Sequence, residues 1–253
     1  MSLVQHIANR WNGYSAEHCP FLCWNAQVGR VAVWNRAGGN EQLYSGHDLN
    51  ENSLVVDVGG FRGDWSAEIS ARYAPHIHIL EPVPEFVQRL RDRFAGNSKI
   101  KIHPFGLGAV NESVALHVQG DGSSVHRAGG DAVVAKVVCA SDFIRTLPTD
   151  EISLLKINIE GSEYDLLNDL LDSGLMECVR TLLVQFHDFV PEAGQRMQAL
   201  HAQLSQTHRP QFQYEFVWES WQRNSMRQRD TPRIGTARLS RPAERVVQAS
   251  GGR

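Results

Sequence analysis

Along most of the chain, short apolar runs alternate with longer stretches in which apolar residues recur every three or four positions. The short runs are rich in Val, Ile and Leu, which is typical of parallel strands covered on both faces. The longer stretches are typical of amphipathic helices. The predicted strands are 54–58, 77–80, 99–103, 153–157 and 179–186, and the predicted helices are 63–73, 84–94, 162–171 and 192–205. This alternation predicts an α/β fold with a doubly wound, mostly parallel sheet.

Two helix starts carry local signals of their own. Pro84 is expected to open its helix, because a missing N–H costs nothing in the first turn. Ser162, followed by Asp165 three positions later, resembles the N-cap of the helix that carries Leu166 and Leu170.

Other segments fit the alternation less regularly. Strand-like patterns recur at 114–118 and 133–138, on either side of the glycine-rich segment 120–124, and again at 212–218. A last strand is predicted at 234–239. The late aromatic residues alternate as the core residues of a strand would, and they are Tyr214, Phe216, Trp218 and Trp221.

We predict three parts in the chain. Residues 1–50 are rich in Trp, Asn and Gly, lack sustained periodicity, and are expected to form short elements that pack on or cap the rest. Residues 51–240 form the α/β domain, and residues 241–253 are predicted to be a flexible basic tail. From Arg223 onward the chain carries eight Arg against two acidic residues. Such a run is more typical of a solvated end than of a ligand-binding segment.

Composition excludes several classes of protein. The chain has 253 residues, of which 42% are hydrophobic, and a formal net charge of -3, so general disorder is excluded. No apolar run is long enough to span a bilayer and no signal peptide is visible, so we expect a cytoplasmic protein. Among four cysteines, Cys19 and Cys23 lie near His18, but no second pair completes a zinc site. We therefore predict free thiols and no metal.

The most informative segment is Asp57-Val58-Gly59-Gly60-Phe61-Arg62-Gly63-Asp64, which follows one predicted strand and precedes a helix. It lies at the carboxyl end of a central strand, where open α/β sheets bind ligands. Its glycines allow the backbone to turn sharply and to approach a ligand closely. The N–H groups that open the next helix favour a carboxylate or a phosphate.

Two cofactors are commonly bound at such a loop. A dinucleotide fingerprint requires Gly-x-Gly-x-x-Gly, which is absent whether it is counted from Gly59 or from Gly60. An acidic residue two positions before the first glycine, with another glycine four positions after it, is instead typical of proteins that bind S-adenosylmethionine (SAM). Glu81 ends the second predicted strand and is expected to accept both ribose hydroxyls, although NAD enzymes carry an acid there too. An unoccupied turn is the remaining alternative.

Four motifs, in order along the chain, resemble the FkbM-type SAM-dependent methyltransferases. Val56-Asp57-Val58-Gly59-Gly60-Phe61-Arg62-Gly63 is similar to their first motif, and Leu80-Glu81-Pro82-Val83-Pro84 to their E-P-x-P strand ending. Gly106-Leu107-Gly108-Ala109 resembles the segment after their third strand. Leu155-Lys156-Ile157-Asn158-Ile159-Glu160-Gly161-Ser162-Glu163 resembles their K-I-D-V-E-G-x-E signature. The resemblance covers about residues 54–190, and four ordered motifs are more specific than one.

This resemblance implies a class I methyltransferase sheet of seven strands with an antiparallel edge strand. It also implies methyl transfer from SAM to a hydroxyl of a carbohydrate, glycolipid or secondary metabolite. By position, glycines and an aspartate would contact the methionine part of SAM, Glu81 the ribose, and Phe105 with Gly106 the adenine. The family's aspartate is Asn158 here, which removes a charge near the transferred methyl group. The predicted cofactor-binding residues are Asp57, Gly59, Gly60, Gly63, Glu81, Phe105, Gly106 and Asn158.

An acceptor hydroxyl is a poor nucleophile, so a positioned base would accelerate the transfer. Glu160 follows the fourth predicted strand, beside the expected methyl position, and its alternative role is to stabilise the start of the next helix. His187 and Asp188 end the next strand at the same edge of the sheet. A histidine has a pKa suited to general-base work, but at a strand end it is often a hydrogen-bonded neighbour. Lys156 is expected to form a structural ion pair.

The leading hypothesis is a SAM-dependent O-methyltransferase with a small-molecule or glycan acceptor. One rival is a catalytically degenerate SAM-binding module, which Asn158 suggests. Another is a nucleotide-cofactor oxidoreductase, which the failed dinucleotide fingerprint disfavours. The overall negative charge disfavours a nucleic-acid partner. We expect no membrane span, and the sequence leaves a homo-oligomer open.

Overall fold

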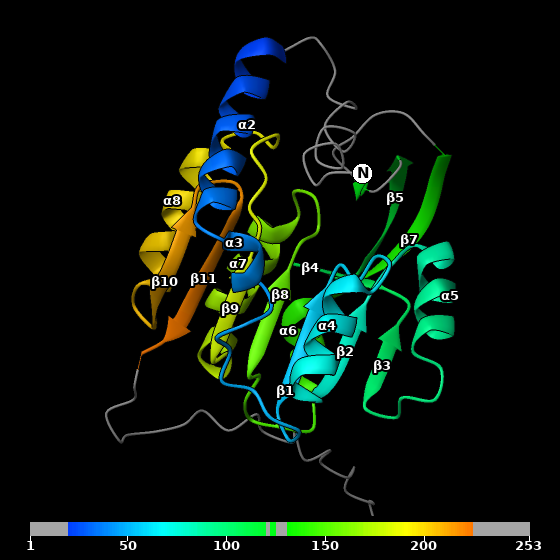
Figure 1. Cartoon of the computed structure of the whole chain (residues 1–253). Helices are drawn as coiled ribbons and strands as arrows, with labels where there is room; N and C mark the ends of the chain where they lie inside the picture. Colours follow the sequence, from blue (N-terminus) through cyan, green and yellow to red (C-terminus); the bar gives the residue numbers. More distant parts are fainter. Residues whose placement is uncertain (1–19, 120–121, 125–130, 225–253) are drawn as a thin grey trace, which may run out of the picture.

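The computed structural model describes residues 20–119, 122–124 and 131–224, which Figure 1 shows in colour. Its main sheet has seven strands in the order β10-β11-β9-β8-β1-β2-β3. They are β1 (Leu54–Val58), β2 (His76–Leu80), β3 (Ile100–His103), β8 (Leu154–Ile157), β9 (Thr181–Val184), β10 (His208–Tyr214) and β11 (Trp218–Arg223). Strands β1, β2, β3, β8 and β9 run parallel, whereas β11 is antiparallel to both of its neighbours.

Helices cover both faces of this sheet (Figure 1). One face is covered by α2 (Pro20–Arg36), α4 (Asp64–Tyr73) and α5 (Pro84–Arg93), and the other by α6 (Ala140–Arg145), α7 (Glu163–Asp172) and α8 (Ala193–Leu204). Along β1, Val55 packs on the first face while Val56 and Val58 pack on the second, and all three are fully buried. A strand buried on both faces is almost continuously apolar, which explains the runs in the sequence. The predicted α/β fold, with a doubly wound, mostly parallel sheet of seven strands, is confirmed.

The regular elements begin and end within two residues of the predicted bounds. Pro84 is the first residue of α5, as predicted. Ser162 occupies the N-cap position of α7, as predicted, but its side chain makes no capping hydrogen bond. The carboxylate of Glu163 accepts a hydrogen bond from the Gly161 N–H instead, at 2.9 Å. Two short elements complete the description, α3 (Gly39–Gln42) and the 3-10 turn η2 (Leu175–Cys178).

The strands predicted at 114–118 and 133–138 form a second sheet rather than part of the first. This sheet has the order β4-β7-β5-β6, with β4 (Gly106–Gly108), β5 (Glu112–Gln119), β6 (Gly122–Ser124) and β7 (Asp131–Cys139). In Figure 1, β5 and β7 rise beyond the upper ends of the parallel strands. These four strands lie between β3 and β8 in the sequence, and we call them the inserted sheet. The inserted sheet therefore lies over the edge of the main sheet at which the parallel strands end.

The single strand predicted at 212–218 is wrong, because a turn interrupts it. Tyr214 ends β10, Trp218 begins β11, and the Val217 N–H donates to the Tyr214 carbonyl at 2.8 Å. Phe216 takes a left-handed backbone conformation with φ of 53°. None of the three turn residues is Gly, Asn or Pro, so the usual signals of a hairpin are missing. The aromatic alternation therefore continues through the turn and conceals it.

The prediction that residues 1–50 form only short elements is also wrong, because α2 has 17 residues. Within residues 26–36 of this helix, for which burial is described, the buried positions are Gln27, Val31 and Trp34, which recur at helical spacing but include a polar residue. Val28 and Val33 are exposed, at 47% and 54%. Apolar residues thus lie on both the buried and the exposed sides of this part of the helix.

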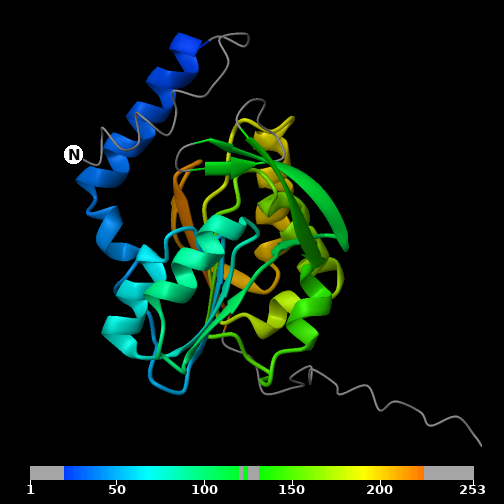
Figure 2. The same cartoon turned by 90° about the vertical axis from the view of Figure 1, so that its right-hand side faces the viewer.

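Helix α2 packs on the β10–β11 hairpin, and Figure 2 shows it projecting from the body of the molecule. The Trp34 ring lies edge-on to Tyr214, with 5.0 Å between centroids. The Gln27 amide donates to the Phe216 carbonyl at 3.0 Å. The Arg30 guanidinium lies over the Phe216 ring, 4.8 Å from its centroid. Two segments that are far apart in sequence thus stabilise each other.

Some predictions fall outside the described residues. Cys19, the 234–239 strand and almost all of the Arg-rich segment lie there. Of the described cysteines, Cys139 and Cys178 are free thiols. No helix in the described part of the chain has the length and apolar character needed to cross a membrane.

Candidate active site

A cavity of about 590 Å³ lies at the carboxyl ends of β1, β2 and β8. The main sheet contributes Gly59, Gly60, Glu81, Asn158 and Glu160 to its wall. The second sheet and the segments that join its strands close another side, with Gly106, Val110, Glu112, Val114, Leu116 and Val137. A cavity is therefore present at the end of the first strand, where the sequence predicted a ligand-binding site. The inserted sheet helps to enclose it.

Glu81 is held on the cavity wall by the backbone. Its two carboxylate oxygens accept hydrogen bonds from the N–H of Phe61 at 2.8 Å and the N–H of Val83 at 3.0 Å. Only 3% of the residue is exposed. Burial raises the pKa of Glu81 to about 7, against the lowering effect of the two N–H donors. Each oxygen keeps acceptor capacity that a ligand hydroxyl could use.

Asp57 does not line the cavity, and its contact with the methionine part of SAM stays a prediction. Its carboxylate accepts from the Lys156 ammonium at 2.8 Å and from the Ser66 hydroxyl at 2.6 Å. Lys156 also donates to the Gly59 carbonyl at 2.9 Å. Asp57 and Lys156 are 1% and 5% exposed. The predicted structural ion pair of Lys156 is confirmed, and its partner is Asp57.

The glycines of the first loop are required by the protein's own packing. A Cβ on Gly59, whose φ is 88°, would lie 2.1 Å from the Asn158 carbonyl oxygen. A Cβ on Gly60 would lie 2.1 Å from the Ile79 side chain. Both residues line the cavity, but the space that a side chain would need is already filled by neighbouring strands. Gly63 precedes α4 and does not line the cavity, and a Cβ there would meet Phe94 at 2.7 Å.

The two residues predicted to lie near the adenine are separated. Gly106 begins β4 and lines the cavity. Phe105 does not, because its ring packs into the core against Phe143 and His103, at centroid distances of 5.9 and 5.5 Å. A one-residue step along an extended chain turns the side chain to the opposite side, which accounts for the difference.

Asn158 lines the cavity at the end of β8, and its buried side-chain oxygen has no hydrogen-bond partner among the described residues. A buried acceptor left unpaired costs free energy, so a ligand with an N–H or O–H group at this position would be stabilised.

The three candidate bases occupy different environments. Glu160 lines the cavity, with a left-handed backbone of φ 55° and 5% exposure. His187 is 3% exposed and lies behind it, with Nε2 of the imidazole 3.8 Å from a Glu160 oxygen. Asp188 pairs with the Arg30 guanidinium of α2 at 2.9 Å. Neither His187 nor Asp188 lines the cavity.

Two neighbouring residues were not predicted. Phe61 has a left-handed backbone with φ of 48°, directs its N–H at Glu81, and packs edge-on against Phe86 at 4.6 Å. Glu163 is fully buried and contacts His187. A sequence signal for Glu163 was present. It is a carboxylate at the start of a predicted helix, within the quoted signature, where backbone N–H groups stabilise negative charge. Phe61 carried no comparable signal.

The cavity wall is more acidic than basic. The carboxylates on it belong to Asp64, Glu81, Glu112, Glu160 and Asp165, and the cations to Arg62 and Lys156. Three of these groups are already in ion pairs, Lys156 with Asp57, Asp64 with Arg93 and Asp165 with Arg196. The balance favours a cationic or hydroxyl-rich ligand over one that carries several phosphates. Among all the described residues, including those of the cavity, no group of three or more His, Cys, Asp or Glu is arranged to hold a metal ion.

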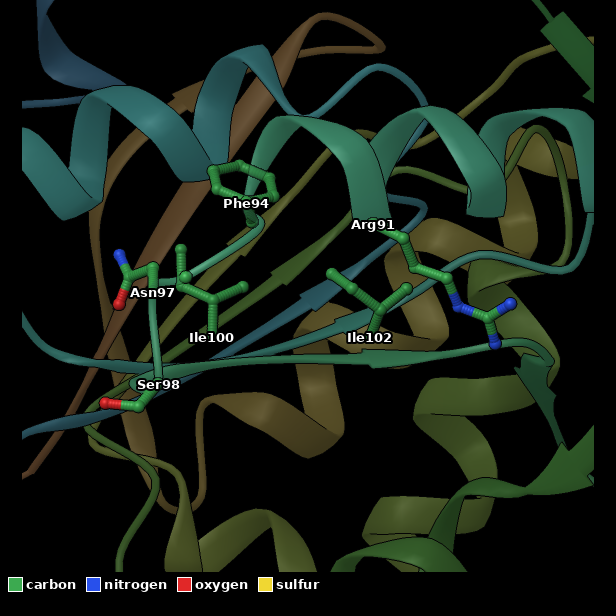
Figure 3. A pocket seen from close by; sticks show the side chains of 7 residues that line it. Arg91, Phe94, Asn97, Ser98, Ile100 and Ile102 are labelled. Atoms are coloured by element: carbon green, nitrogen blue, oxygen red, sulfur yellow. The ribbon is translucent and has the colours of Figure 1, made fainter.

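A second, shallow depression of about 420 Å³ lies between the end of α5 and β3 (Figure 3). Arg91 and Phe94 border it opposite Ile100 and Ile102. Its lining contains no carboxylate, histidine or thiol. The residues that suit catalysis therefore belong to the larger cavity.

We expect Lys156→Met to lower the free energy of unfolding by about 3 to 5 kcal/mol, because it leaves the Asp57 carboxylate buried without its cation. The double variant Asp57→Asn/Lys156→Met should be clearly more stable than the sum of the two single effects. Urea denaturation of all four proteins measures this coupling. Strictly additive single effects would contradict the pairing.

The buried Glu81 carboxyl should make stability depend on pH. Its pKa in the folded protein, about 7, lies above the ordinary 4.5, so its contribution is fully present below pH 4.5 and is lost as the pH rises through 7. Relative to Glu81→Gln, the protein should therefore lose about 2 to 3 kcal/mol between pH 5 and pH 8. Urea denaturation at both values tests this, and parallel profiles would contradict it.

Comparison with known proteins identifies the family. A family model described as "Methyltransferase FkbM domain" matches residues 57–216. Phosphoethanolamine N-methyltransferase of Plasmodium falciparum (isolate 3D7) is 34% identical over 67 residues, which are 25% of this chain and 25% of that protein.

Two solved structures are also similar. Methyltransferase FkbM from Methylobacillus flagellatus KT has a TM-score of 0.48 at 16% identity, covering 70% of this chain and 44% of that one. SAH-bound Podospora anserina methyltransferase PaMTH1 has a TM-score of 0.42 at 12% identity, covering 68% and 72%. Because the family match extends over more than half of the chain and includes the strands that build the cavity, the chain belongs to the FkbM methyltransferase family.

Proposed function

We propose that this protein is a SAM-dependent methyltransferase that binds the donor in the cavity at the carboxyl ends of β1, β2 and β8. The observation that carries the proposal is the Glu81 carboxylate, held on the wall of an otherwise acidic cavity by two backbone N–H groups. SAM combines a ribose diol, which suits a carboxylate acceptor, with sulfonium and ammonium charges, which suit an acidic wall.

The residues on the wall fit this donor in four respects. Glu81 would accept the ribose hydroxyls, and Gly106 on β4 lines the region proposed for the adenine. Gly59 and Gly60 would present backbone to the methionine part. The unpaired Asn158 oxygen would accept from a donor group such as the ammonium. Asp57, Gly63 and Phe105 would act on the site indirectly, since they do not line the cavity.

When bound, SAM supplies an electrophilic methyl group whose leaving group is a neutral thioether. The chain's own task is then to align an acceptor oxygen and to remove its proton. Among the candidate bases, we assign this role to Glu160, because it lines the cavity whereas His187 and Asp188 do not. Asp188 is instead paired with Arg30 and would help to hold its loop against α2.

We propose that the acceptor is a hydroxyl of a carbohydrate, glycolipid or secondary metabolite. Two features support this class. Carboxylates such as Glu112 and Asp165 on the wall can accept hydrogen bonds from neighbouring hydroxyls. Val110, Val114 and Leu116 offer an apolar surface for the non-polar face of a ring or chain. A dinucleotide is disfavoured, since its phosphates would face this acidic wall.

We expect Glu81→Ala to weaken SAM binding at least about tenfold, because hydrogen bonds from two hydroxyls to a charged acceptor are lost. Isothermal titration calorimetry measures the Kd. Glu85→Ala is the matched control, since Glu85 is an exposed carboxylate on α5 paired with Arg89. An unchanged Kd in Glu81→Ala would contradict the ribose assignment, and NADH binding more tightly than SAM would favour an oxidoreductase.

Glu160→Gln should lower the rate of methyl transfer about 100-fold while leaving the Kd for SAM within about twofold, because a base contributes to the transfer rather than to donor binding. Release of S-adenosylhomocysteine is measured with a panel of monosaccharides, glycolipids, phenols, amines and RNA. Transfer confined to amines or RNA would overturn the hydroxyl assignment. SAM binding without transfer to any member of the panel would favour a degenerate binding module.

A further inference from the structure

Behind the cavity wall lies a row of three buried titratable side chains, Glu160, His187 and Glu163. They are 5%, 3% and 0% exposed. Glu160 lines the cavity, and neither of the others does. Burying three such groups together is costly unless they are paired, so the arrangement calls for an explanation.

Glu163 fixes the imidazole by two contacts to the same oxygen. Its Oε1 accepts from the His187 backbone N–H at 2.8 Å and lies 3.1 Å from Nδ1 of the ring. Because a carboxylate only accepts, Nδ1 must carry the proton in this pair. The other oxygen, Oε2, accepts from the Gly161 N–H at 2.9 Å. In the neutral ring, Nε2 is then left as the acceptor, 3.8 Å from a Glu160 oxygen.

We propose that Glu163 and His187 form a proton relay behind Glu160, with Glu163 as the positioning residue that sets the tautomer of His187. This inference rests on the proposed function, in which Glu160 takes the proton of the acceptor hydroxyl. In that step the acceptor O–H bond would break and the oxygen would form the new bond to the methyl carbon, while the methyl–sulfur bond would break and its electron pair would remain on the neutral thioether. The proton would bond to a Glu160 oxygen. It would then pass to Nε2 of His187 once the 3.8 Å between the two atoms shortens to hydrogen-bond distance, and Glu160 would return to a carboxylate.

Charge balance favours this sequence. Protonation of Nε2 converts His187 to an imidazolium. This cation lies between the carboxylates of Glu160 and Glu163, which stabilise its positive charge from both sides. A buried carboxylate that orients a histidine and stabilises its charged form is the arrangement of the serine protease triad, with a carboxylate in place of the serine. The row therefore offers a place for the proton away from the cavity.

The surrounding charged groups are already paired with one another. Asp188, next to His187, pairs with Arg30 of α2. The Tyr164 hydroxyl donates to the His187 carbonyl at 2.7 Å, and the Arg196 guanidinium lies over the Tyr164 ring. Arg196 also pairs with a carboxylate of α7. Glu160 and Glu163 are two carboxylates whose oxygens lie near the ring nitrogens, one on each side of the imidazole.

The test reads His187 directly in the ligand-free protein, so it does not depend on SAM binding or on an acceptor. Long-range 1H–15N correlation spectra of 15N-labelled protein report the tautomer and the titration midpoint, and His187→Gln assigns the signals. We expect the Nδ1–H tautomer. Glu163→Gln should lower the midpoint by at least about one pH unit, because a carboxylate beside the imidazolium is lost.

Controls separate the relay from a merely structural role. Asp172→Asn removes an exposed charge at the far end of the same helix and should move the midpoint by less than about 0.3 pH units. Glu160→Gln should also lower the titration midpoint of His187. If Glu163→Gln does not fold, Glu160→Gln serves as the test in its place. An Nε2–H tautomer, or a midpoint that neither carboxylate changes, would overturn the relay while leaving SAM binding at Glu81 untouched.

Discussion

The buried ion pair between Asp57 and Lys156 is the interaction on which the site depends. It joins the two central strands, β1 and β8, at the edge where both end. Lys156 also binds the Gly59 carbonyl, so the same ammonium holds the first glycine loop against the neighbouring strand. Because the pair is almost fully buried, its position tolerates little movement. The geometry of the loop therefore follows from the packing of the sheet rather than from a ligand.

From this anchored loop, main-chain groups build much of the cavity. Phe61 directs its N–H at Glu81 from a left-handed conformation, and the end of β2 brings Val83 to the other oxygen. The carboxylate is consequently held in place before any ligand binds, which lowers the entropy lost on binding. The same pattern recurs after β8, where Glu163 at the start of α7 is held by the N–H groups of Gly161 and His187.

The inserted sheet and the N-terminal helix adapt a common α/β core to one site. The inserted sheet adds an apolar wall beside the acidic strand ends, so the cavity combines two kinds of surface. Helix α2 packs on the terminal hairpin and, through Arg30, on the loop that follows β9. Both additions lie at the carboxyl edge of the sheet, where open α/β folds bind their ligands.

The sequence by itself predicted the five parallel strands and four of the covering helices, with bounds within two residues, because strands buried on two faces are almost continuously apolar and amphipathic helices repeat every 3.6 residues. It also determined which strand ends carry the polar residues. It failed at α2 and at the 215–217 turn, whose local residues are not typical of the structures they adopt. There, contacts with distant segments outweigh local preference.

Only the tertiary structure decided which polar residues at those strand ends face the cavity. In the sequence, Asp57 and Glu81 are both acidic residues near the end of a strand. In the structure, Asp57 pairs with Lys156 inside the protein, whereas Glu81 lines the cavity. Glu160 and His187 likewise looked equivalent as bases, but the latter lies behind the former. Direction and burial of a side chain depend on neighbours from other strands, and a linear pattern contains no information about their distances.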